Sequence, residues 1–271
     1  MLTKSGGSTK QIKDGETDIT PNLEITNLGI VSRDYGHTYR NGYRDFSEAL
    51  PAVLEVLDDK GCDAVLFSLF SIIPRNDLIV SNYLKNLKHI KAVFLEEYHD
   101  GDERQAERFV TYHMTQRGWS EYELTQKFGT ITAMDQKDIE DFVQNEMPRR
   151  ILGNSCVLLC GETNGVKYSS SDGRVIDSFA LRATIPKKVN IVLNPIHDRM
   201  IRFEMKLKRK FLSEHGRWVV SVWNKGKKDK NGKKRDGKAP AWTVYYNGEE
   251  SPILRIETEL PAIEIGILNI A

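Results

Sequence analysis

Residues 156–164 read CVLLCGETN, an apolar run that ends at Cys160 and turns away at once through Gly161. A short apolar run bounded by turn residues is typical of a strand that is buried on both faces of a sheet. A thiol at the end of such a strand can lie at the carboxyl edge of the sheet, where the following backbone N–H groups can form an oxyanion hole. Cys160 is therefore a candidate nucleophile. The alternative interpretation is a small buried hydrophobic residue.

The segments on either side of this run alternate between strand and helix signals. Residues 23–31 and 64–67 are apolar runs that predict strands, and apolar residues at helical spacing over 46–57 predict a helix between them. The same reasoning predicts helices at 77–87, 137–144 and 199–215, a hairpin at 109–127, and strands at 91–95, 191–193, 217–223, 241–246, 253–258 and 263–268. This pattern favours one α/β domain with a mixed sheet over residues 23–271, preceded by a disordered arm at 1–22.

The composition excludes several classes of protein. With 39 Lys+Arg against 38 Asp+Glu, the formal net charge of +1 gives no overall attraction for nucleic acid or for an anionic membrane. No apolar run is long enough to span a membrane, and the polar N-terminus lacks the apolar centre of a secretion signal, so we expect a cytoplasmic protein. The three cysteines, Cys62, Cys156 and Cys160, do not form a disulfide framework, and no Cys or His pair completes a zinc site. We expect neither a metal nor a cofactor.

The order of five segments resembles that of the carbon–nitrogen hydrolase (nitrilase) superfamily. The segments are GCDAVLF (61–67), ELTQKF (123–128), CVLLCGETN (156–164), NIVLNPIHDRM (190–200) and GRWVVSVWNKG (216–226). The resemblance covers roughly residues 24–270; each motif is short, and the order and spacing carry it. It implies a four-layer α-β-β-α sandwich, a homodimer, and a small amide or nitrile as the substrate.

The resemblance also implies roles for particular residues. Cys160 matches the family's nucleophile, and Lys127 matches the lysine that stabilises the tetrahedral intermediate. The backbone N–H of Gly161 matches an oxyanion donor. The positions that match the family's substrate pocket are Glu162, Asn194, His197, Trp223 and Asn224.

The sequence departs from the family at the catalytic glutamate. Leu69 stands where that general base is expected, and a leucine cannot accept a proton. Glu96 and Glu97 are disfavoured as replacements, because the chain between them and Lys127 looks too short for a hairpin and a strand. Glu162 or Glu146 could act only if the fold brings it to the thiol. Two functions therefore stay open: a hydrolase with a displaced base, or a catalytically degenerate binding or regulatory module.

A second feature is the lysine loop (residues 225–238), which carries eight basic side chains. Such a loop can bind the phosphates of a nucleotide or another polyanion. The alternative is a solvated hairpin insertion, because acidic residues and glycines dilute the charge. No aromatic residue lies between the lysines, so stacking on nucleic-acid bases is not indicated.

Overall fold

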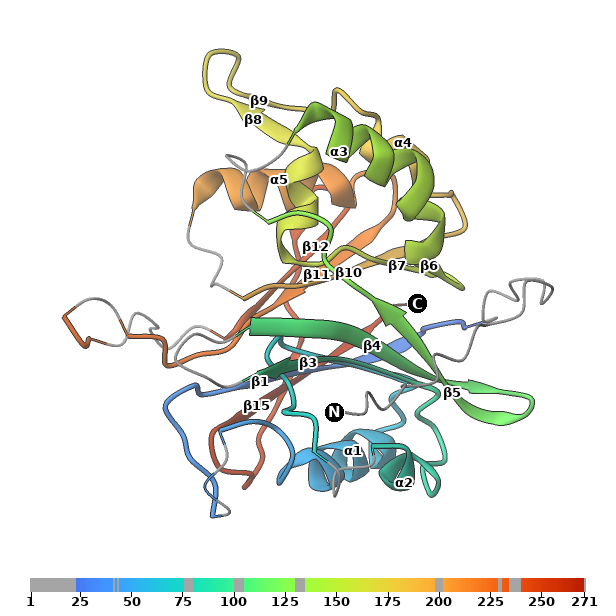
Figure 1. Ribbon diagram of the computed structural model, residues 1–271, viewed down its shortest axis with the longest axis vertical. Helices are drawn as coiled ribbons and strands as arrows, with labels where there is room; N and C mark the ends of the chain where they lie inside the picture. Colours follow the sequence, from blue (N-terminus) through green and yellow to red (C-terminus); the bar gives the residue numbers. More distant parts are fainter. Residues whose placement is uncertain are drawn as a thin grey trace, which may run out of the picture.

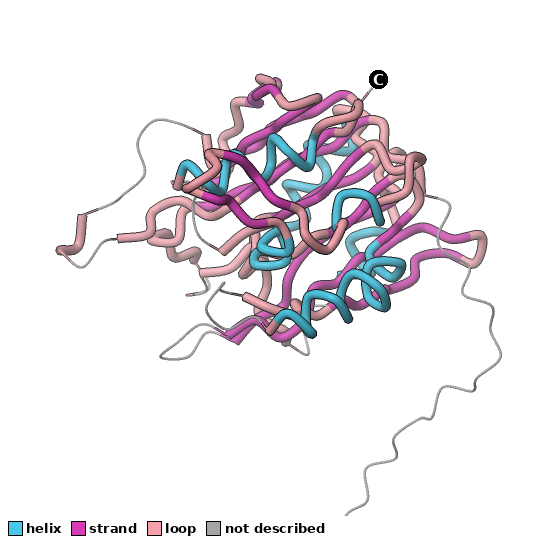
Figure 2. The backbone as a smooth tube through the Cα atoms, turned by 90° about the horizontal axis from the view of Figure 1, so that it is seen from above, coloured by secondary structure: helices cyan, strands magenta, loops and turns pink. Residues whose placement is uncertain are grey.

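Two β-sheets face each other in the middle of the molecule, and helices cover the outer face of each (Figure 1). The computed structural model describes residues 23–40, 42, 44–75, 80–99, 105–129, 135–197, 202–228, 231–233 and 240–270. The predicted arm at 1–22 lies outside these residues. Seen from above, the strands of both sheets run in similar directions (Figure 2), as in aligned sheet packing. Among the described residues, no helix is long and apolar enough to cross a membrane.

The first sheet has seven strands in the order β14-β15-β1-β2-β3-β4-β5. Strands β1, β2 and β3 are parallel to one another, and the remaining neighbours are antiparallel. Helices α1 (Leu50–Asp59) and α2 (Val80–Leu84) cover its outer face. The strands are β1 (Asn27–Arg33), β2 (Ala64–Phe67), β3 (Ala92–His99), β4 (Gln105–Thr115), β5 (Gly118–Leu124), β14 (Leu254–Ile256) and β15 (Ile263–Asn269).

The second sheet has six strands in the order β13-β12-β11-β10-β7-β6, and its central strands β7, β10 and β11 are parallel. The strands are β6 (Ile151–Leu152), β7 (Ser155–Val157), β10 (Ile191–Pro195), β11 (Trp218–Val222), β12 (Trp242–Tyr246) and β13 (Glu249–Glu250). Its outer face carries α3 (Gln136–Asp141), α4 (Leu181–Thr184), α5 (Phe203–Ser213) and a small hairpin of β8 (Lys167–Ser169) and β9 (Arg174–Ile176). Because β7 and β10 are parallel neighbours, the residues that follow them meet at one edge of the sheet.

Three apolar layers hold the sheets and helices together. Leu66 of β2 packs between the two sheets, whereas its neighbours Val65 and Phe67 pack toward α1. Leu212 of α5 packs in the third layer, on the outer face of the second sheet, with Val192 of β10. This alternation along β2 explains why its sequence is an unbroken apolar run, since both faces of the strand are buried. The predicted four-layer α-β-β-α architecture is confirmed.

Local sequence signals predicted several elements well. Strand β2 occupies the predicted residues 64–67, and α1 ends before Gly61, which has a φ of 71°. Asn247 and Gly248 have φ values of 48° and 85° in the tight turn between β12 and β13. Positive φ at both central residues is what a two-residue hairpin turn requires.

The predicted strand at 156–160 is wrong over its second half. Strand β7 ends at Val157, and Cys160 instead begins a 3₁₀ turn, Cys160–Gly165. The cause is Glu162, whose Oε2 accepts the Leu159 N–H at 2.8 Å and so turns the backbone away from the sheet. The hairpin β8–β9 and helix α4 were not predicted, because their segments are short and mostly polar.

Candidate active site

Cys160 is a free, half-buried thiol at the edge where β7 and β10 end. Its Sγ accepts the backbone N–H of His197 at 3.5 Å. On another side the thiol packs against a small apolar cluster that includes Ile196 and Trp223. The nucleophile candidate therefore has a polar neighbour and an apolar wall.

His197 links this thiol to a carboxylate. The imidazole Nε2 lies 3.1 Å from Oε2 of Glu96, which leaves Nδ1 as the ring nitrogen available to Cys160. The thiol and the imidazole also interact electrostatically, and each shifts the pKa of the other. Covalent catalysis uses an arrangement of three groups: a nucleophile, a base within reach of it, and a third group that orients the base.

The electrostatics of this group favour a thiolate and an imidazolium. Burial by itself raises the pKa of Cys160, but the hydrogen bonds and positive charge of His197 outweigh it, and the pKa falls below the ordinary thiol value. For His197, burial by itself lowers the pKa, while the hydrogen bonds and negative charges of Cys160 and Glu96 raise it well above the usual range. Opposite shifts of this kind favour the charged form of each group.

Glu96 comes from β3, where it shares the face of Phe94 that points between the sheets. Its Oε2 also accepts the Phe70 N–H at 2.7 Å, and its own N–H donates to Ser71 Oγ at 2.9 Å. The expectation that the chain between Glu96 and Lys127 is too short for a hairpin is wrong, because the whole β4–β5 hairpin lies between them.

Phe70 adopts a strained backbone conformation at this site. Its φ of 53° lies in the left-handed region, which costs free energy for a residue with a bulky side chain. In this conformation its N–H points at Glu96, and its ring centroid lies 4.4 Å from that of His197. The strained residue therefore positions two members of the group.

Leu69, at the position where the resembled family has its glutamate, is buried in the core between the sheets. Its carbonyl oxygen accepts Asn224 Nδ2 at 2.7 Å, and the Ser68 hydroxyl donates to Asn224 Oδ1. Asn224, beyond the end of β11, thus ties the second sheet to the segment after β2. The role that these contacts give Asn224 is a structural one.

We expect Leu69→Glu to lower the free energy of unfolding rather than to restore a base. A carboxylate at this position enters an apolar core without a partner, at a cost of about 3–5 kcal/mol. Urea denaturation measures the loss, and Leu69→Met, which keeps the volume, serves as the control with a cost below about 1.5 kcal/mol. Wild-type stability together with a gain of amide hydrolysis in Leu69→Glu would contradict this placement.

Lys127 lies just beyond β5, where its Nζ pairs with Glu146 Oε1 at 3.0 Å. Glu146 ends the π-helical segment Phe142–Glu146. The side chain of Lys127 is 39% exposed, so its ammonium is in contact with solvent as well as with Glu146. A role of Lys127 in stabilising the tetrahedral intermediate stays a prediction.

Glu162 is fully buried and holds the turn after Cys160. It pairs with Arg150 Nη2 at 2.6 Å, and it accepts the Lys127 N–H at 3.0 Å as well as that of Leu159. Burial raises its pKa to about 7, although Arg150 and the two N–H groups act in the opposite direction. Gly161 cannot carry a side chain here, because a Cβ would lie 2.2 Å from the carbonyl oxygen of Gly129.

Asn194 anchors a buried cation beside the thiol. Its Oδ1 accepts Nε and Nη2 of Arg209 at 3.1 and 2.8 Å, and its Nδ2 donates to Leu158 O at 2.5 Å. Burial lowers the pKa of Arg209 to about 10, while the negative charge of Cys160 acts to raise it. Arg209 therefore adds positive potential at the thiol. Its place on a basic helix gave no sign of this in the sequence.

The comparisons with known proteins bear on the fold alone. No family model matches the sequence, and no curated protein matches it. Among solved structures, a carbon–nitrogen hydrolase from Helicobacter pylori has a TM-score of 0.46 at 8% identity, over 91% of this chain and 89% of that one. A double mutant of an amidase from a Nesterenkonia species, in complex with acrylamide, has a TM-score of 0.47 at 11% identity, over 92% and 93% of the two chains.

A third solved structure is a glutamine-dependent NAD(+) synthetase from Cytophaga hutchinsonii. It has a TM-score of 0.43 at 8% identity, and the match covers 90% of this chain but only 43% of the synthetase. This chain therefore corresponds to less than half of that enzyme's length.

Proposed function

We propose that this protein is a cysteine-dependent hydrolase of carbon–nitrogen bonds in which His197, oriented by Glu96, is the general base. The observation that carries the proposal is that His197 lies between Glu96 and Cys160: its ring Nε2 is 3.1 Å from Glu96 Oε2, and its backbone N–H donates to Cys160 Sγ at 3.5 Å. The base thus comes from the end of β10 and its carboxylate from β3, so Leu69 need not be a base. The resemblance of the segment order supports amides or nitriles as substrates.

The proposed reaction with an amide has two halves. The Cys160 thiolate attacks the carbonyl carbon, and the His197 imidazolium then protonates the nitrogen as the C–N bond breaks and the amine leaves. The neutral imidazole next takes a proton from water, whose oxygen attacks the thioester and releases the acid together with the thiolate. We propose the Gly161 N–H as a donor to the oxyanion, and Arg209 as a fixed charge that favours the thiolate.

Mass spectrometry of the intact protein tests this function with a panel of small amides and nitriles at neutral pH. We expect at least one compound to leave a covalent adduct that maps to Cys160 and disappears in Cys160→Ala. Cys62 and Cys156 are internal controls, because burial raises the pKa of each to about 12. A panel that gives no adduct, or an adduct on another residue, contradicts the proposal.

Removing the charge of the orienting carboxylate is expected to weaken the site strongly. In Glu96→Gln the glutamine side chain still reaches His197, but it carries no negative charge to favour the imidazolium. The pKa of Cys160 therefore rises, and acylation slows by on the order of 10²-fold. Rates of adduct formation across pH measure the effect. Glu97→Gln is the matched control, since Glu97 pairs with Arg108 at 2.6 Å instead. Equal losses in the two variants would contradict the role of Glu96.

A binding or regulatory module is the second candidate function. Leu69 favours it, because the resembled family's base is missing at that position. This candidate predicts that a ligand binds near Cys160 without forming an adduct at any pH.

A further inference from the structure

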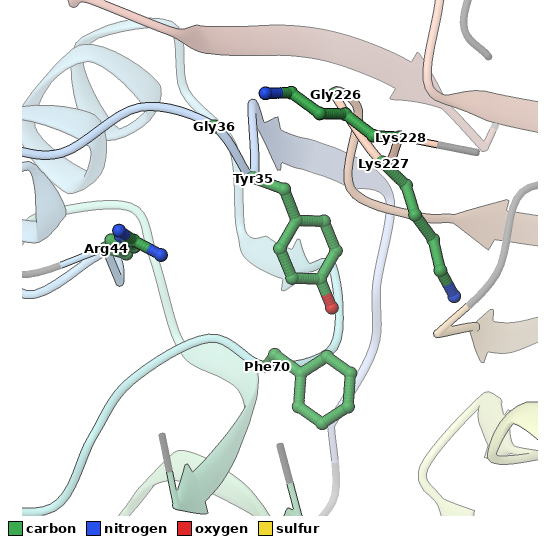
Figure 3. Close-up of a pocket in the computed structure, with 7 residues that line it drawn as sticks. All are labelled: Tyr35, Gly36, Arg44, Phe70, Gly226, Lys227 and Lys228. Atoms are coloured by element: carbon green, nitrogen blue, oxygen red, sulfur yellow. The ribbon is translucent and has the colours of Figure 1, made fainter. Parts of the chain in front are cut away.

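An open pocket of about 580 Å³ lies beside the catalytic group (Figure 3). Its side-chain lining consists of two aromatic rings and three cations: Tyr35, Phe70, Arg44, Lys227 and Lys228. Figure 3 shows Arg44 across the open space from the two rings, while the lysines extend from the turn at Gly226. The volume lies within the range of small-molecule pockets, which is about 300–1,000 Å³.

The electrostatics of the pocket favour an anion. Among the described residues that line it, none is acidic. Two aspartates lie next to lining residues in sequence. Asp34 Oδ1 accepts the Gly36 N–H at 2.7 Å and occupies the space beside Gly226, and Asp45 Oδ2 accepts the Ile73 N–H at 2.8 Å, so the three cations outnumber the one carboxylate seen at the wall. Cations that line one pocket attract a carboxylate or phosphate, and arginine can bind either with two parallel hydrogen bonds.

The aromatic wall connects this pocket to the thiol. The rings of Tyr35 and Phe70 meet edge to face, with centroids 6.2 Å apart. The same Phe70 ring lies 4.4 Å from the ring of His197, which in turn contacts Cys160. Phe70 therefore lines the pocket and also contacts His197, so the pocket and the candidate catalytic residues share one side chain.

We propose that this pocket binds the anionic end of the substrate, a planar ring that carries a carboxylate or a phosphate, and that it thereby brings the acyl carbon to Cys160. The second half of this inference, the placement of the acyl carbon at Cys160, rests on the proposed function. Two described lysines of the lysine loop, Lys227 and Lys228, line the pocket. In this proposal they bind a small anion. Lys225, at the start of the loop, pairs with Glu264 at 2.7 Å and has a structural role.

Isothermal titration calorimetry on the Cys160→Ala protein tests the binding half without any chemistry. The probes are phenyl phosphate and benzoate, which are ring-bearing anions, together with neutral benzamide and ring-free inorganic phosphate. We expect one of the ring-bearing anions to bind at least about tenfold more tightly than both controls, because only these combine a charge with a ring. Comparison of the two anions distinguishes a phosphate from a carboxylate ligand.

Substitution of the cations locates the binding. Arg44→Gln and Lys228→Gln are each expected to weaken binding by roughly 3- to 10-fold, with a smaller effect at high salt. Lys137→Gln is the control, since it removes the same charge from α3 on the far side of the second sheet. No binding of either ring-bearing anion, or binding that Arg44→Gln and Lys228→Gln leave unchanged, overturns the proposal. If an oligonucleotide, added as a further probe, binds while neither ring-bearing anion does, that result overturns the proposal as well.

Protection of the thiol tests the placement of the ligand. The anion that binds is expected to slow alkylation of wild-type Cys160 by iodoacetamide, and Arg44→Gln should require a higher concentration of the anion for the same protection. Binding without protection overturns the pocket as a substrate site. Binding and protection without any adduct from the amide and nitrile panel would instead contradict the proposed hydrolase and leave the anion pocket supported.

Discussion

Replacing His197 with glutamine is expected to slow alkylation of Cys160 by iodoacetamide at neutral pH by on the order of 10²-fold. Glutamine is neutral, so the imidazolium that holds the pKa of the thiol down is lost while the burial that raises it remains. Each unit by which the pKa rises above the working pH removes about nine tenths of the remaining thiolate. Alkylation followed by peptide mass spectrometry measures the rate at Cys160 itself.

The matched control for this variant is His113→Gln. His113 is a buried histidine on β4, and burial lowers its pKa, so it remains neutral. Its replacement should leave the reactivity of Cys160 within about twofold of wild type, as expected for a distant, independent site. If both variants react at the wild-type rate, His197 does not activate the thiol.

A large loss of stability is also expected from breaking the buried ion pair of Arg150 and Glu162. Arg150→Met leaves the Glu162 carboxylate fully buried without its cation, which costs about 3–5 kcal/mol of unfolding free energy. Urea denaturation at neutral pH measures the loss. Because Glu162 fixes Leu159 and Lys127, we also expect alkylation of Cys160 to become less selective over the other cysteines.

The double variant Arg150→Met/Glu162→Gln separates the charge from the packing. The glutamine amide that replaces the carboxylate carries no charge, so the double variant should recover a large part of the stability that Arg150→Met loses. Additive losses in the single and double variants would show that the ion pair is not coupled across this turn.

Much of the fold could be predicted from local sequence signals. The apolar run at 64–67 could only be a strand buried on both faces, and it is β2. Gly61 and the pair Asn247-Gly248 marked backbone positions with positive φ, which the structure has. These signals depend on a few neighbouring residues, so they can be read without knowing the tertiary structure.

The contacts among Cys160, His197 and Glu96 could not be predicted in the same way. Glu96 and His197 are 101 residues apart, and only the packing of the two sheets brings them within 3.1 Å. The sequence around Phe70 does not indicate its left-handed conformation, because that conformation is fixed by a hydrogen bond to a carboxylate far away in the sequence. One signal was available: a cysteine and a histidine follow two strands that are parallel neighbours, and such residues meet at one edge of a sheet.

The pH dependence of Cys160 alkylation in the wild-type protein tests the activated thiol most directly. The lowered pKa of Cys160 means that the thiolate forms as pH rises through a value below that of an ordinary thiol, and the raised pKa of His197 keeps the imidazolium present above it. We predict that the rate at Cys160 reaches its plateau below the ordinary pKa of a cysteine, which is about 8.5. A rate that rises only at or above that value would contradict the proposed thiolate–imidazolium pair.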